Sequence, residues 1–164
     1  MAKSFSQDLG QQLEDAVTAA NERYAALGLL QMGKVATPIK QLSKMKSDGS
    51  FLARHEQRAH VDFYGVVRAG VLRGQACALE CKATADGRFP YSGIRPQQRE
   101  WLDATPLAFV LVHFTRLNSV RLIPWNQFAA KTSVGPEHGL KADAVDWAKH
   151  VIALTHADLE AFKP

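Results

Sequence analysis

Segment 61–82 constrains the fold more than any other part of this sequence. Two apolar runs flank a glycine-containing stretch, a pattern that predicts a β-hairpin. Residues two apart in a strand point to the same face, so Glu80 and Lys82 share one face. An ordinary core strand avoids such charges, and the opposite face is apolar: Cys77, Leu79 and Cys81. One face therefore packs on a core, and the other is a candidate for chemistry.

The register of the hairpin decides whether a second carboxylate joins Glu80. One register pairs Asp62 with Glu80 and leaves residues 68–74 as the tip. A tighter turn at residues 69–70 would place Asp62 opposite Cys77 instead. The sequence alone leaves both registers open. The chemistry favours the first, because it brings two carboxylates together beside a lysine and so predicts a metal site with an attached base or charge stabiliser.

Composition sets the class of protein. The chain has 164 residues, of which 46% are hydrophobic, and this predicts a single globular domain over residues 1–164. The net charge of +4 is a mild preference for polyanionic partners. Cys77 and Cys81 would lie on one strand face, where they cannot easily form a disulfide, so we expect a reduced, cytoplasmic protein. No apolar run is long enough to span a membrane.

The remaining pattern predicts a mixed α/β fold. Apolar residues between 7 and 27 recur at helical spacing, and Gly28 suits the end of that helix. The continuous apolar run 107–114 is typical of a strand covered on both faces. A central mixed β-sheet flanked by helices follows from these and from the other predicted elements: strand 29–39, helix 96–104, strand 119–123, a short helix opening at 124–128 and helix 143–150.

Residues 40–60 differ in composition from the rest of the chain. They are basic and contain few apolar residues, and Asp48-Gly49 is a strong turn signal. We interpret the segment as a projecting basic arm that binds DNA through five side chains: Lys40, Lys44, Lys46, Arg54 and Arg58. A solvated loop is the alternative, although a loop of this length in a compact domain is more often functional or disordered than idle.

A family resemblance rests on the acidic residues. Asp62, the triplet Glu80-Cys81-Lys82 and a glutamine on the next helix look like the PD-(D/E)XK nuclease pattern. Over most of its length the chain resembles the RecU-type Holliday-junction resolvases. The pieces that match follow the same order: Gly10-Gln11-Gln12-Leu13-Glu14, Thr37-Pro38-Ile39, Val61-Asp62-Phe63-Tyr64-Gly65-Val66, Glu80-Cys81-Lys82-Ala83-Thr84, Phe89-Pro90-Tyr91, and Gln98 ahead of Trp101-Leu102.

The resemblance implies a restriction-endonuclease-like core and a homodimer that binds a four-way DNA junction. Such enzymes nick two strands symmetrically with Mg²⁺, for which Mn²⁺ is an alternative. Transferred to this chain, Asp62 and Glu80 would hold the metal and Lys82 would be catalytic. Gln98 would support the site, and Glu14 matches an acidic position on the first helix.

Two features depart from the family pattern. The hairpin tip between Asp62 and Glu80 is longer than expected, and Cys81 stands where a small residue such as alanine is expected. Neither of these two departures removes a catalytic group.

The segment 40–60 matches the family's stalk, which projects into the junction.

Other interpretations compete with this one. The same residues fit a repair or restriction-type nuclease on ordinary duplex, or a non-catalytic DNA-binding module with a structural ion-pair cluster. Taken alone, Glu14 and Gln98 would be ordinary solvated side chains. Four residues have rings that can stack on bases, although core packing is the favoured interpretation for Trp101: Tyr64, Phe89, Tyr91 and Trp101.

Overall fold

The computed structural model describes residues 5–36, 39–41, 53–55 and 60–158. A six-stranded sheet forms its centre, with strand order β1-β4-β5-β7-β8-β10. The strands β5 and β7 run parallel, and their neighbours in this sheet pair antiparallel. The predicted mixed α/β fold is confirmed. The strands of this sheet are β1 (Leu30–Lys34), β4 (Phe63–Val67), β5 (Ala76–Thr84), β7 (Leu107–Phe114), β8 (Ser119–Pro124) and β10 (Leu140–Ala142).

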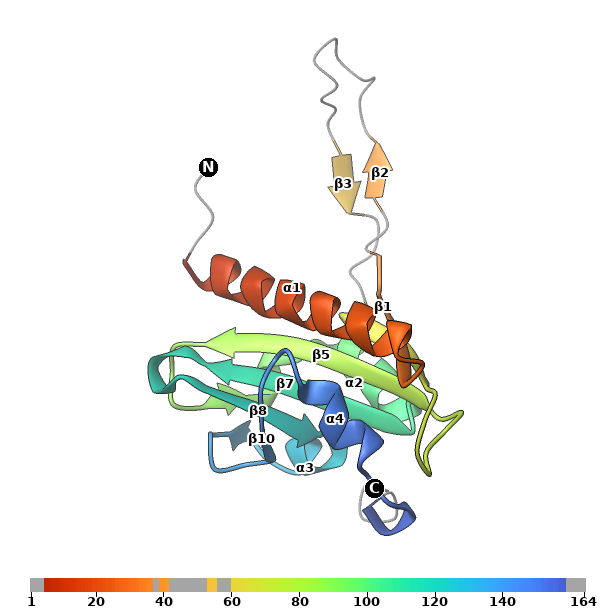
Figure 1. The fold of residues 1–164 in the computed structure, drawn as a ribbon. Coiled ribbons are helices and arrows are strands. Elements are labelled where there is room, and N and C mark those ends of the chain that lie inside the picture. Colours follow the sequence, from red (N-terminus) through yellow and green to blue (C-terminus); the bar gives the residue numbers. More distant parts are fainter. Residues whose placement is uncertain (1–4, 37–38, 42–52, 56–59, 159–164) are drawn as a thin grey trace.

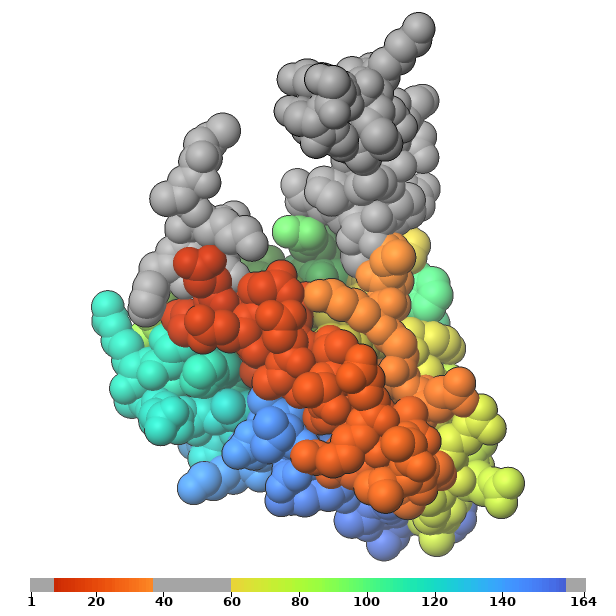
Figure 2. Space-filling view, turned by 45° about the horizontal axis from the view of Figure 1, so that its top comes forward, coloured from red at the N-terminus to blue at the C-terminus, as the bar shows by residue number. Residues whose placement is uncertain are grey.

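Helices cover both faces of the sheet. On one face lie α1 (Phe5–Ala26) and α4 (Trp147–Ile152), and on the other lie α2 (Pro96–Ala104) and α3 (Trp125–Ala129). Figure 1 shows these two helical layers around the strands, and Figure 2 shows α1 (red to orange) directly beside the C-terminal segment (blue). The Trp147 indole N–H donates to Asn21 Oδ1 at 3.2 Å, which ties α4 to α1.

Helix α1 forms because its apolar residues make one stripe. Leu13, Val17, Ala20 and Tyr24 are all buried against the sheet, at the helical spacing that predicted the element. The helix ends at the predicted place, because Gly28 adopts a φ of +68°. The N–H groups of Leu29 and Gly28 donate to the carbonyls of Tyr24 and Ala25, which is the Schellman arrangement.

The hairpin adopts the register that the chemistry favoured. Phe63 pairs with Leu79, so Asp62, one residue earlier, lies across from Glu80. At the other end the Val67 N–H donates to the Gln75 carbonyl at 3.0 Å. The tip is residues 68–74, as predicted, and its two glycines, Gly70 and Gly74, have positive φ angles. The alternative register, with Asp62 opposite Cys77, is excluded because Cys77 pairs with Gly65.

The two faces of β5 also match the prediction. Cys77, Leu79 and Cys81 are buried in the core cluster under α1, and both cysteines are free thiols. Ala78 belongs to the second cluster, under α2 and α3. Glu80 follows Ala78 on that face, since strand residues alternate.

The predicted strand 29–39 is wrong in its length. Strand β1 ends at Lys34, which pairs with Phe63, the first residue of β4, so the partner strand ends there. Ile39–Gln41 (β2) and Ala53–His55 (β3) form a separate two-stranded antiparallel sheet. Figure 1 shows this pair away from the main sheet. The projection of the whole segment 40–60 as an arm stays a prediction, because residues 42–52 and 56–59 lie outside the described ones.

Several short elements differ from the prediction. The expected helix 143–150 begins only at Trp147. Residues 85–95, for which no helix or strand was predicted, contain β6 (Phe89–Pro90) and a 3-10 turn at Tyr91–Gly93. Strand β6 pairs with β9 (Ser133–Val134), and β10 adds to the edge of the main sheet beside β8. Strands of two or three residues are too short to show alternation in sequence. Helix 96–104 and strand 107–114 occur with the predicted bounds.

No helix in the part of the chain that the structure describes is long and apolar enough to cross a membrane.

Candidate active site

The acidic pair consists of Asp62, which immediately precedes β4, and Glu80, which lies across from it on the neighbouring strand β5. The Asp62 N–H donates to Glu80 Oε2 at 3.2 Å, and the Cys81 N–H donates to Asp62 Oδ2 at 2.8 Å. The Lys82 ammonium donates to Glu80 Oε1. Strand alternation and cross-strand pairing therefore bring two carboxylates and one ammonium together, as the sequence predicted.

Helix α2 adds Gln98 to this group. Pro96 opens the helix, and the Gln98 side chain folds back so that its Oε1 accepts the Arg95 N–H at 3.0 Å. Its Nε2 donates to Glu80 Oε1. Gln98 is buried, so the interpretation as an ordinary solvated glutamine is wrong. One side chain thus fixes the start of α2 and holds the carboxylate.

Burial shapes the electrostatics of the pair. Glu80 is fully buried, and this burial raises the pKa of its carboxyl to about 7, against the opposing effect of Lys82. Burial also raises the pKa of Asp62, while the Cys81 N–H and Lys82 oppose the rise. When both are ionised, the buried Glu80 carboxylate and the half-buried Asp62 carboxylate beside one ammonium leave one negative charge uncompensated. A divalent cation would neutralise that charge.

The donor set fits Mg²⁺. This ion prefers carboxylate oxygens, keeps several waters and is commonly bound through one or two carboxylates plus substrate phosphates. Within the residues that the structure describes, no three His, Cys, Asp or Glu side chains lie close enough together to hold a metal ion. Asp62 and Glu80 stay the predicted metal ligands, and water and phosphate oxygens would fill the remaining positions.

Glu14 has a different contact from those of Asp62 and Glu80: it pairs with a lysine on β1. It lies on α1, and its carboxylate forms an ion pair with the Lys34 ammonium at 2.8 Å. Its charge is near enough to raise the pKa of Asp62. Glu14 thus pairs with Lys34 on β1, and its catalytic role stays a prediction.

The predicted DNA-binding residues are described only in part. Lys40 on β2 lies directly across from Arg54 on β3, so both belong to the small two-stranded sheet. Lys44, Lys46 and Arg58 lie outside the described residues. Their role stays a prediction.

Tyr64 and Trp101, both named above as possible stacking residues, meet His60 in an aromatic cluster that the sequence did not predict. Trp101 was expected in the core, but 37% of it is exposed. Its ring stacks on His60 and meets Tyr64 edge-on. A signal was present in the sequence, because Trp101 lies three residues after Gln98 and therefore on the same side of α2.

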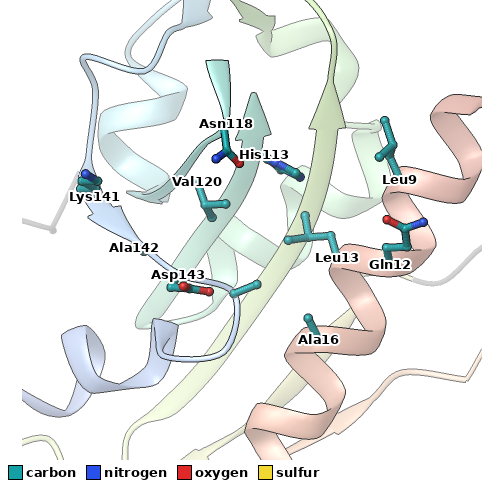
Figure 3. Close-up of a pocket in the computed structure, with 11 residues that line it drawn as sticks. Leu9, Gln12, Leu13, Ala16, His113, Asn118, Val120, Lys141, Ala142 and Asp143 are labelled. Carbon is teal, nitrogen blue, oxygen red and sulfur yellow. The ribbon is translucent and has the colours of Figure 1, made fainter. Parts of the chain in front are cut away.

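A cavity of about 400 Å³ lies elsewhere, between the first half of α1, the β7–β8 connection and the segment around β10. Figure 3 shows Leu13 and Gln12 on one side of this opening, with His113 and Val120 across from them. None of the candidate catalytic residues lines it. The acidic pair is a separate site: Cys81 packs under α1, and its neighbour Glu80 lies on the opposite face, where Gln98 of α2 contacts it.

The titration of Glu80 gives a testable consequence for the metal-free protein. Because the folded-state pKa is raised, the folded protein binds more protons than the unfolded chain between about pH 4.5 and 7. Stability should then fall as the pH rises through this range, by on the order of 3 kcal/mol in the free energy of unfolding. Urea denaturation in EDTA at pH 5 and pH 8 measures it. Glu80→Gln should remove most of this dependence; an equal pH dependence in that variant would contradict the account.

Comparison with known proteins supplies the family. The family model described as RecU, recombination protein U, matches residues 8–158. The chain belongs to the RecU family. Its candidate residues Glu14, Asp62, Glu80, Lys82 and Gln98 all fall within the matched range. A search of curated proteins found no match.

Membership of the RecU family implies a role in recombination as a Holliday-junction resolvase, and therefore junction DNA as a binding partner. The mixed α/β architecture, with its central sheet flanked by helices, is consistent with a nuclease core. The resemblance noted from short motifs is thus confirmed at the level of the family.

Proposed function

We propose that this RecU-family chain is a Mg²⁺-dependent endonuclease that resolves four-way DNA junctions by nicking two strands symmetrically, as a homodimer. One observation supports the catalytic part most strongly. The register of the hairpin places Asp62 across from Glu80, with Lys82 and Gln98 both bonded to the same Glu80 oxygen. Taking two acids out of water costs free energy, and an ordinary buried strand gains nothing that would offset this desolvation.

Each residue has a separate part in the proposed hydrolysis. Asp62 and Glu80 would hold the metal, which when bound lowers the pKa of a water and screens the charge of the phosphate. The Cys81 N–H fixes Asp62, and Gln98 fixes Glu80, so both carboxylates are oriented before substrate arrives. Lys82 leaves Glu80 Oε1 and donates to the attacking water or to the phosphate, where negative charge grows.

The proposed symmetry can be tested strand by strand. A mobile four-way junction would be prepared four times, each time with a different strand labelled at its end. We expect Mg²⁺-dependent nicks in two opposing strands at matching positions, and none in EDTA. Cuts in one strand only, or in all four strands at unrelated positions, would contradict a symmetric dimeric resolvase.

The position of the small sheet β2–β3 allows a test of the basic arm by deletion. Strands β2 and β3 pair with each other and not with the main sheet, so a chain lacking residues 41–58 and closed by a short linker should still fold. It should lose preference for junctions over duplex more than it loses cleavage chemistry. Each lost phosphate contact should also lower the salt dependence of binding by about one unit of slope.

Binding to a four-way junction and to matched duplex across a salt series measures both effects. A melting transition shows whether the shortened chain is folded. If the folded, shortened protein keeps the full junction preference, the segment is a solvated loop with no part in selecting the substrate.

A further inference from the structure

Three aromatic rings from two separate parts of the chain meet beside the acidic pair. His60 precedes β4, Tyr64 lies on β4 and Trp101 lies on α2. The His60 and Trp101 rings stack with centroids 5.0 Å apart and planes 18° from parallel. The Tyr64 ring meets Trp101 at 5.4 Å and 87°, edge to face. Both arrangements are ones that aromatic pairs prefer, so each contact stabilises the position of its rings.

Each ring is close in the chain to a residue of the candidate active site. Tyr64 pairs with Ala78, which lies two residues before Glu80 on the same strand face. Trp101 is one helical turn beyond Gln98, whose side chain holds Glu80. The cluster and the carboxylates therefore lie on the same face of the sheet, and DNA bound at the site passes next to the rings.

Two rings of the cluster are exposed, whereas Trp125 and Phe128 on the same face are buried. Tyr64 is 38% exposed and Trp101 37%. The rings of Trp125 and Phe128 stack on each other and are buried. Scattered apolar residues on a surface need no explanation, but ordered and exposed aromatic rings beside a phosphate-cleaving site are the kind of platform on which nucleic-acid bases stack.

We propose that the cluster of His60, Tyr64 and Trp101 stacks against an unpaired nucleobase of the DNA strand at the active site. The choice of DNA as ligand rests on the proposed function. An unpaired base is the specific occupant because stacking on a protein ring needs an open base face, which an intact duplex covers with its neighbouring base pairs. A four-way junction at rest pairs all its bases, so such a base has to be freed at the branch point when the protein opens the junction, or be built in there as an unpaired base.

Trp101 provides its own reporter. The protein has three tryptophans. Trp125 and Trp147 are 5% and 0% exposed, so Trp101 alone among them is accessible to a stacked base. In EDTA, where cleavage is blocked, a four-way junction with unpaired bases at its centre should quench the tryptophan fluorescence of the full chain. Trp101→Phe should still bind the junction but lose the quenching.

Affinity gives a second readout. Base stacking on an aromatic side chain changes binding by about 5- to 150-fold when the ring is removed, so Trp101→Ala should weaken junction binding within that range. Tyr64→Phe keeps the ring and should lose far less affinity than Trp101→Ala. The matched control is Leu117→Ala, which truncates an exposed apolar residue between β7 and β8 and should leave binding unchanged.

Three results would overturn the proposal and leave the nuclease assignment standing. The first is junction binding with no change in tryptophan fluorescence and with full affinity in Trp101→Ala. The second is equal quenching by intact duplex and by the junction. The third is a change in oligomeric state of Trp101→Ala by sedimentation at unchanged DNA affinity, which would make the cluster a protein interface. Failure to bind any DNA would overturn both the platform and the proposed function.

Discussion

Glu80→Gln and Asp62→Asn are each expected to abolish cleavage of a four-way junction while binding to it persists. Each change keeps the shape of the side chain but removes one of the two carboxylates that would hold the metal. Less negative charge at the site cannot weaken attraction for phosphate, so junction affinity in EDTA should be unchanged or stronger. Cleavage in Mg²⁺ and binding in EDTA, measured on the same junction, separate the two effects.

Glu100→Gln is the matched control for these variants. It makes the same change of charge on an exposed position of α2 and should cleave normally. Undiminished cleavage by either Asp62→Asn or Glu80→Gln would contradict the assignment of the pair as the metal site.

Lys82→Ala is the second change with a large expected effect. The ammonium bonds Glu80 in the metal-free protein and is 21% exposed, so it can reach a bound phosphate or water. Losing one charged contact to a transition state costs about 10²–10³-fold in rate, and we expect a fall of that size in single-turnover cleavage. Because Lys82 lowers the pKa of Glu80, the variant should also need a higher pH to bind metal.

Metal binding itself should survive in Lys82→Ala, since both carboxylates remain. Lys131→Ala, at an exposed position after α3, controls for the loss of one positive charge and should cleave at the normal rate. If the single-turnover cleavage rate of Lys82→Ala falls by less than a few-fold, Lys82 lies near the site but has no catalytic role.

The central hairpin was predictable because its chemistry and its pattern agreed. Alternation put Glu80 and Lys82 on one face, and the expectation that acids converge on a metal selected the register that the structure has. The degree of burial was not predictable, because it depends on α2 and on the buried Gln98, which come later in the chain. The raised pKa of Glu80 follows from that burial.

The errors have physical causes as well. Trp101 is large, apolar and next to Leu102, which made a core position the natural expectation. Successive helical residues point about 100° apart, so one of the two neighbours faces the sheet and the other does not. Leu102 is 1% exposed and Trp101 37%. Strand 29–39 was predicted too long because a strand's end is set by its partner, and β4 begins only at Phe63.

The comparison of a mobile four-way junction with a linear duplex of matched sequence, each incubated with the purified protein and Mg²⁺, tests the central claim most directly. The account predicts that the junction is nicked in Mg²⁺, that the duplex is cut far more slowly, and that Glu80→Gln cuts neither. Equal rates on the two substrates would contradict the junction-resolving function. Absence of metal-dependent cleavage of both by the unaltered chain would contradict the nuclease itself.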